Sequence, residues 1–84
     1  MSPQAISRVL RTGGFYTTSN YNRQGMRARR SPLPGEVSVI AQFDLDAQAV
    51  RVAAEAAQYL REHGYTVRVN PKHPQLLTVT KEVK

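Results

Sequence analysis

The clearest periodic pattern lies in residues 45–63, where apolar and polar side chains recur with helical spacing. The apolar stripe consists of Leu45, Ala49, Val52, Ala53, Ala56 and Leu60. The polar stripe opposite consists of Arg51, Glu55, Gln58 and Glu62. We predict a helix that begins after Asp44 or Asp46, with an aspartate accepting N-terminal backbone N–H groups, and that ends at Gly64. Because its apolar side is mostly alanine, we expect the helix to lie close against a β-sheet.

Three further segments alternate apolar and polar residues with the period of two that is typical of β-strands. The first, residues 36–43, precedes the helix, and residues 65–70 and 76–80 follow it. A turn at residues 70–74, which contains two prolines, separates the last two segments. These two segments therefore predict a β-hairpin with a longer loop.

The same alternation predicts which side chains share a face of the sheet. If Leu77 and Val79 face the helix, the opposite face is mostly polar. That opposite face carries Leu76, Thr78, Thr80, Thr66 and Arg68.

The N-terminal third of the chain is less regular. Ser2 followed by Pro3 is typical of a helix start, and two glycines end the short apolar stripe that follows. Residues 15–20 have the threonine and aromatic content of a strand, and residues 26–30 predict a second strand that pairs back on them. The predicted order is α, β, β, β, α, β, β: a small mixed α+β fold with a mainly antiparallel sheet and helices on one face.

Length and composition favour one domain, residues 1–84, with one core, because the chain has 84 residues and is 40% hydrophobic. At this size folding buries about 60% of the surface of the unfolded chain, so a deep catalytic cleft is hard to build. The absence of cysteine excludes disulfides, thiolate chemistry and cysteine-based zinc sites. No signal-peptide pattern and no membrane-spanning run is present, so we expect a cytoplasmic protein without membrane contact.

Charge is unevenly distributed along the chain, whose net charge is +6. All of that excess lies in residues 1–35, which contain six arginines and no acidic residue, whereas the basic and acidic residues of the remainder balance. An electrostatic field of one sign attracts polyanions or acidic surfaces. The charge pattern therefore bears on partners rather than on the fold.

The densest basic cluster lies just before and within the predicted strand at residues 26–30, where Arg27 and Arg29 point to one face. Guanidinium groups bind phosphates in a bidentate manner, and aromatic rings stack on unpaired bases. The alternative is a solvated edge strand whose charges prevent aggregation between sheets. The predicted nucleic-acid-binding residues are Arg23, Arg27, Arg29, Arg30, Arg8, Arg11 and Tyr21.

Catalytic chemistry has little support in the sequence. His63, at a helix end, and His73, in a turn, do not belong to a metal-ligand spacing, and Asp44 and Asp46 are explained as helix-start residues. No phosphate-binding loop, dinucleotide fingerprint, nucleophile elbow or zinc-protease motif occurs. We therefore expect no catalytic residue, no metal site and no cofactor. The exposed positions of the central strands also lack the aromatic residues of an RRM.

Residues 4–43 resemble the HicA toxin family in their order of elements: a short helix, a Gly-Phe corner at 14–15, a strand, a turn at Gly25 and further strands before a helix. Those toxins are small RNA-cleaving domains of double-stranded-RNA-binding type. In that family a histidine follows the turn glycine and carries the cleavage, whereas Met26 and Arg27 follow it here. The resemblance thus implies an RNA-binding ancestry without ribonuclease activity.

Residues 61–67 also resemble segments of small uncharacterised proteins from actinobacterial phages and mobile elements. This likeness implies an origin in a phage or mobile element and does not indicate an activity.

Three classes of function follow from these patterns. The first is a small basic non-enzymatic protein that contacts DNA or RNA through its arginine cluster. The second is a protein-interaction module that docks on an acidic host surface, or forms a homodimer through an edge strand. The third, an RNA-cleaving enzyme, would require His63 or His73 to act from an unusual position.

Overall fold

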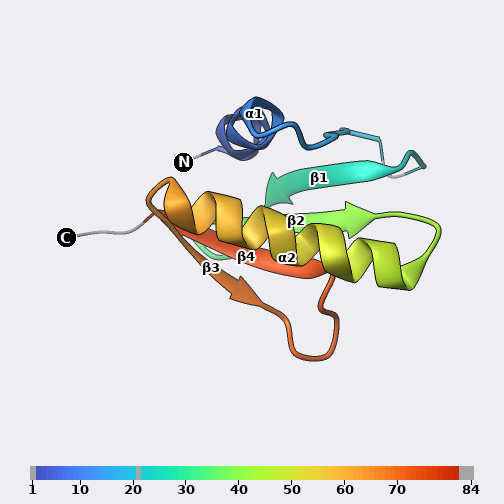
Figure 1. The fold of residues 1–84 in the computed structure, drawn as a ribbon. Coiled ribbons are helices and arrows are strands. Elements are labelled where there is room, and N and C mark those ends of the chain that lie inside the picture. Colours follow the sequence, from blue (N-terminus) through green and yellow to red (C-terminus); the bar gives the residue numbers. More distant parts are fainter. Residues whose placement is uncertain (1, 21, 82–84) are drawn as a thin grey trace.

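The computed structural model describes residues 2–20 and 22–81 and shows a four-stranded antiparallel sheet with two helices (Figure 1). In chain order the elements are α1 (Pro3–Thr12), β1 (Gly25–Arg30), β2 (Glu36–Gln42), α2 (Asp46–Glu62), β3 (Tyr65–Val69) and β4 (Leu76–Lys81). The order of strands across the sheet is β1-β2-β4-β3. The succession helix, strand, strand thus occurs twice, and β2 and β4 join the two halves in the middle of the sheet. The predicted α+β class is confirmed.

Helix α1 begins as its sequence predicts. The Ser2 side-chain Oγ accepts a hydrogen bond from the backbone N–H of Ala5 at 3.2 Å, and Pro3 occupies the first helical turn. Proline is favourable there because the first backbone N–H groups of a helix have no partner within the helix. Ile6 and Leu10, one turn apart, are fully buried and attach the helix to the core.

The start of α2 differs from the prediction of an aspartate cap. Leu45 occupies the N-cap position, and no described side chain accepts a hydrogen bond from the first turn. Asp46 lies inside the first turn instead, where its charge is favourable toward the helix dipole. The predicted stop is confirmed, since Gly64 has a φ of +89°, a conformation that residues with a Cβ rarely adopt.

The buried side chains form one cluster between the sheet and the helices. The strands contribute Met26, Val37, Val39, Ala41, Val67, Leu77 and Val79. The helices contribute Ile6, Leu10, Ala49, Ala53, Ala56, Ala57 and Leu60. The pairing register places the buried strand residues on one face of the sheet, for example Met26 opposite Ala41 and Val79 opposite both Val37 and Val67. Both helices therefore pack on that face, as predicted.

The expected strand at residues 15–20 does not form, so two strands rather than three lie between the helices. Only Thr17 bridges Met26, in a parallel arrangement, and β1 pairs along its whole length with β2 instead of pairing back on residues 15–20. The physical reason lies in local side-chain bonds. The Thr18 hydroxyl accepts a hydrogen bond from the N–H of Asn20 at 3.1 Å, which favours a turn over a strand ladder.

Candidate functional site

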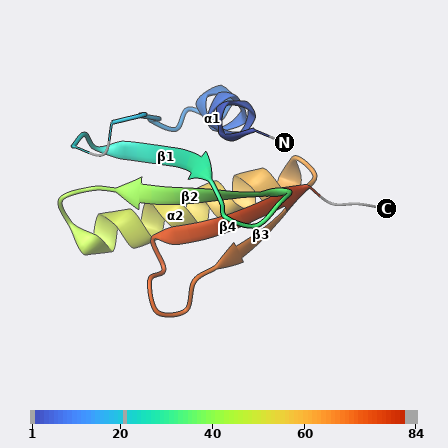
Figure 2. The same ribbon diagram turned by 180° about the vertical axis from the view of Figure 1, so that it is seen from behind.

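We call the face of the sheet opposite the helices the open face, because no described helix lies over it (Figure 2). The loop between β1 and β2, whose Ser31 bonds Glu36, crosses one end of it. Strand alternation and the pairing register assign the side chains of the open face. They are Arg27, Arg29, Glu36, Ser38, Ile40, Gln42, Thr66, Arg68, Leu76, Thr78 and Thr80. Two predictions are confirmed: Arg27 and Arg29 share one uncovered face, and the face away from α2 is mostly polar.

A glutamine holds Arg27 in place on this face. The Nε–H of Arg27 donates to the Oε1 of Gln42 at 2.7 Å. The Nε2 of the same glutamine donates to the backbone carbonyls of Arg23, at 2.9 Å, and Asn20, at 3.2 Å. Gln42 therefore fixes the guanidinium of Arg27 and ties the loop before β1 to the sheet.

Arg29 and Arg68 lie in the same row across the four strands, because Arg29 pairs with Ser38, Ser38 with Thr78, and Thr78 with Arg68. Three strand spacings separate the two arginines, which is about 14 Å between their Cα atoms. Only the short hydroxyl side chains of Ser38 and Thr78 stand between them. The row thus presents one guanidinium near each edge of the sheet.

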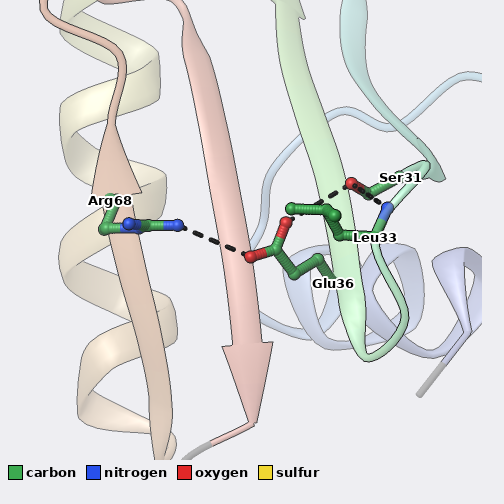
Figure 3. Close-up of polar contacts among 4 residues, drawn as sticks. All are labelled: Ser31, Leu33, Glu36 and Arg68. Atoms are coloured by element: carbon green, nitrogen blue, oxygen red, sulfur yellow. Dashed lines mark hydrogen bonds and ion pairs between the residues drawn. The ribbon is translucent and has the colours of Figure 1, made fainter.

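Glu36 is the one acidic residue on this face within the described part of the chain, and Figure 3 shows its polar contacts. Its Oε1 lies 3.5 Å from the Nη2 of Arg68, which reaches across β4, and its Oε2 accepts a hydrogen bond from the Ser31 hydroxyl at 3.4 Å. The side chain of Glu36 is 15% exposed, whereas that of Arg68 is 74% exposed. An exposed ion pair contributes only about 0–1 kcal/mol, so Arg68 can leave Glu36 for a phosphate at little cost.

The electrostatic balance of the open face is positive. Among residues 2–20 and 22–81 it carries the guanidinium groups of Arg27, Arg29 and Arg68 and one carboxylate, that of Glu36. The other described acidic residues belong to α2 or to the loop before it. Within residues 2–20 and 22–81, the contact between Arg68 and Glu36 is the one ion pair, so Arg27 and Arg29 form no described bond to a carboxylate.

The structure does not bring the other predicted binding residues onto the open face. By strand alternation Arg30 points to the helix-covered side of the sheet, and it is exposed because it lies at the end of β1. Arg23 lies in the loop before β1. Arg8 and Arg11 are exposed on α1, where Arg11 lines a hollow of about 310 Å³. Tyr21 lies outside the described residues. The role of each of these residues in binding stays a prediction.

Sequence reasoning missed two residues of the site, Gln42 and Arg68. The alternation of residues 65–70 places Arg68 on the polar face, but its position in the row of Arg29 depends on the strand order across the sheet. The contact of Gln42 with Arg27 depends on the register between β1 and β2. Neither the row of Arg68 nor the contact of Gln42 can be predicted before the pairing of the strands is known.

Neither histidine belongs to a strand of the open face: His63 follows α2, and His73 lies in the turn between β3 and β4. The Nδ1 of His63 is 2.8 Å from the backbone carbonyl of Tyr59, and its ring centroid lies 4.2 Å from the ring centroid of Tyr59. The backbone N–H of His73 donates to the Oδ1 of Asn70 at 3.1 Å. Nowhere in the described chain do histidine and carboxylate side chains form a group that could hold a metal ion.

The described helices are also too short or too polar to span a bilayer.

Comparison of the chain with family models, curated proteins and solved structures gives no match. The function is therefore inferred from the geometry and charge of the open face.

Proposed function

We propose that this protein is a small non-enzymatic nucleic-acid-binding protein whose open sheet face contacts the phosphate backbone. The observation that carries the proposal is the placement of Arg27 and Arg29 on one uncovered face, with Arg68 in the same cross-strand row as Arg29. Guanidinium groups at such positions bind phosphate oxygens through paired N–H donors. Arg23 lies in the loop that Gln42 ties to this face and extends the basic surface there, whereas Arg30 points to the other side of the sheet.

The chemistry of the face favours backbone contacts over base recognition. Ser38, Thr78 and Thr80 provide hydroxyl groups, which bond phosphate and sugar oxygens without reading sequence. Among the described residues of the strands, alternation places no aromatic side chain on the open face. Stacking contributes about 1–3 kcal/mol per base in single-strand binders, and this surface lacks that contribution. We therefore expect binding with little dependence on sequence.

A salt titration tests the proposal. Fluorescence anisotropy with labelled duplex DNA, duplex RNA and single strands would give the slope of log affinity against log salt. Each neutralised phosphate contributes about −0.9 on duplex DNA and about −0.7 on a single strand. We expect the double variant Arg27→Ala/Arg29→Ala to flatten the duplex slope by about 1.8, which is two contacts.

The matched control removes the same charge elsewhere. Arg51 is exposed on α2, in the helical layer. The double variant Arg51→Ala/Lys72→Ala, whose second site is exposed in the turn after β3, would lower the net charge equally and should change the slope by less than half as much. Equal effects of the two double variants, or no binding of any nucleic acid at low salt, would overturn the proposal.

The alternative, a protein-interaction module, would use the same arginines against an acidic surface. One form of it, a homodimer through an edge strand, meets two obstacles. Antiparallel self-pairing of β1 around Ala28 would place Arg27 opposite the Arg29 of the second copy, and like charges opposite each other are unfavourable. On the other edge, the Nη2 of Arg61 donates to the carbonyl of Val67 at 2.8 Å and occupies an acceptor of β3.

A further inference from the structure

A groove runs along the side of α2 that faces the segment after α1. It consists of three hollows with volumes of about 480, 350 and 340 Å³. The first and second hollows share Phe15 and Glu55, and the second and third share Tyr16 and Phe43. The three hollows therefore form one continuous surface feature. Along α2 it extends from Gln48 to Glu62, which is about 21 Å of helix.

Aromatic side chains from distant parts of the chain meet in this groove. Four of the five aromatic residues that the structure describes line it, namely Phe15, Tyr16, Phe43 and Tyr59. The ring centroids of Phe15 and Tyr59 are 5.7 Å apart, and Tyr16 is 82% exposed. A side chain with this exposure contributes little to the core and is accessible to a partner.

Gly13 gives the groove its shape at one end. A Cβ atom at this position would lie 2.6 Å from the ring of Tyr59, well inside van der Waals contact. The backbone of residue 13 therefore lies directly against the tyrosine ring. This contact allows the segment after α1 to run close to α2.

The charge of the groove is opposite to that of the open face. Glu55 and Glu62 line it, and none of the described residues lining the three hollows is an arginine or a lysine. The chain has a net charge of +6, so an acidic surface with aromatic walls differs clearly from the positive charge of the molecule as a whole. Such a surface attracts cationic groups through its carboxylates and through the faces of its rings.

We propose that this groove is a docking site for a segment of another protein that combines aliphatic side chains with lysine or arginine. The aliphatic side chains would pack against Phe15, Phe43 and Tyr59, and the cationic groups would lie at Glu55 and Glu62. The length and openness of the groove fit a peptide of several residues better than a compact ligand. The proposal rests on a surface distinct from the arginines of the open face and stands independently of nucleic-acid binding.

The probe for this site is a labelled short peptide of leucine, lysine and alanine, with a control peptide in which glutamate replaces lysine. Anisotropy at low salt would measure affinity, and amide chemical shifts in NMR spectra would locate the contact. We expect the lysine peptide to bind and to shift residues of the groove, whereas the glutamate peptide binds at least tenfold more weakly. Equal binding of both peptides, no binding of the lysine peptide, or shifts confined to the open face would overturn the proposal.

Matched variants separate the groove from general electrostatics. Glu55→Gln/Glu62→Gln should weaken binding of the lysine peptide by about threefold to tenfold, because each lost surface pair is a small contribution. Asp44→Asn/Asp46→Asn removes the same charge outside the three hollows and should change the affinity by less than twofold. All four positions are exposed, so the variants keep the core. Equal losses in the two variants would contradict a contact at the groove.

Tyr16, the fourth aromatic residue of the groove, provides a test that does not depend on the glutamates. Tyr16→Ala removes an exposed ring and should weaken peptide binding by about fivefold while the nucleic-acid affinity stays unchanged. Sedimentation velocity covers the other possible occupant, a second copy of this chain. A concentration-dependent dimer that Glu55→Gln/Glu62→Gln abolishes would show that the groove binds the protein's own basic surface, and would overturn the choice of a foreign partner.

Discussion

The open face of the sheet and the groove along α2 lie on opposite sides of the molecule and differ in almost every chemical property. The open face carries short hydroxyl side chains and, among the described residues, three arginines and one glutamate. The groove is hollow, has aromatic walls and is lined by two glutamates. A net charge of +6 thus conceals two surfaces of opposite sign. For a small protein, the distribution of charge over its faces is more informative than the sum.

The largest expected difference between the two faces of the sheet concerns stability. Leu77 is fully buried against the helices, whereas its neighbour Leu76 lies half-buried on the open face. Leu77→Ala should lower the free energy of unfolding by about 2–5 kcal/mol, and Leu76→Ala by about 1 kcal/mol or less. Urea unfolding followed by circular dichroism measures both losses. Equal losses would mean that the open face is covered in solution, which would remove the basis for a binding surface there.

The next effect concerns the close contact at the end of the groove. Gly13→Ala pushes a methyl group into the ring of Tyr59 and should cost about 1–3 kcal/mol in unfolding free energy. NMR spectra should show shifted ring resonances of Tyr59 and Phe15. Gly14→Ala is the control, because nothing lies within 4 Å of its Cβ position and its cost arises from a φ of +85° alone. Ring shifts of equal size in both variants would contradict the contact.

A smaller loss is expected on the open face from Gln42→Ala. This change removes the bond to Arg27 and the two bonds to the loop carbonyls, so we expect a loss of about 1–2 kcal/mol in unfolding free energy. Amide hydrogen exchange of residues 22–24 should accelerate. Gln42→Glu keeps an acceptor for Arg27 but adds a carboxylate to the face, so it should weaken nucleic-acid binding more than Gln42→Ala does. The reverse order of binding affinities would argue against phosphate contacts beside Arg27.

The smallest effect on stability is expected for Arg68→Ala, which breaks an exposed ion pair and should change the unfolding free energy by at most about 0.5 kcal/mol. Its effect on binding should nevertheless be measurable. The salt slope on duplex DNA should fall by about 0.9, the contribution of one phosphate. Arg51→Ala is the single-site control on α2. An unchanged slope for Arg68→Ala would confine the binding surface to β1.

The regular elements could be predicted because their patterns are local. Period-two alternation identified the strands at residues 36–42 and 65–69, and helical spacing identified α2. The segment at residues 15–20 was predicted wrongly because strand-forming residue types there compete with the turn bonds of Thr18. At the start of α2, two aspartates flank Leu45, and the pattern alone did not show that the leucine occupies the cap position.

The sites were harder to predict because their members are far apart in sequence. Arg27 and Arg29 were placed on one face by strand alternation, which needs only residues 26–30. Arg68 joins them through the strand order across the sheet, which depends on the pairing of β2 with β4. The groove combines residues 15–16, Phe43 and Tyr59, and only the packing of α2 beside the segment after α1 brings them together.

The repeated order of helix, strand and strand has a consequence for how the chain tolerates cleavage. Each half contains its own hairpin, and the β2–β4 pairing and the shared core are what hold the halves together. The backbone between them, at residues 43–45, makes no strand pair. Two fragments divided there would each lose the apolar surface that the other half covers, so we expect neither fragment to fold alone.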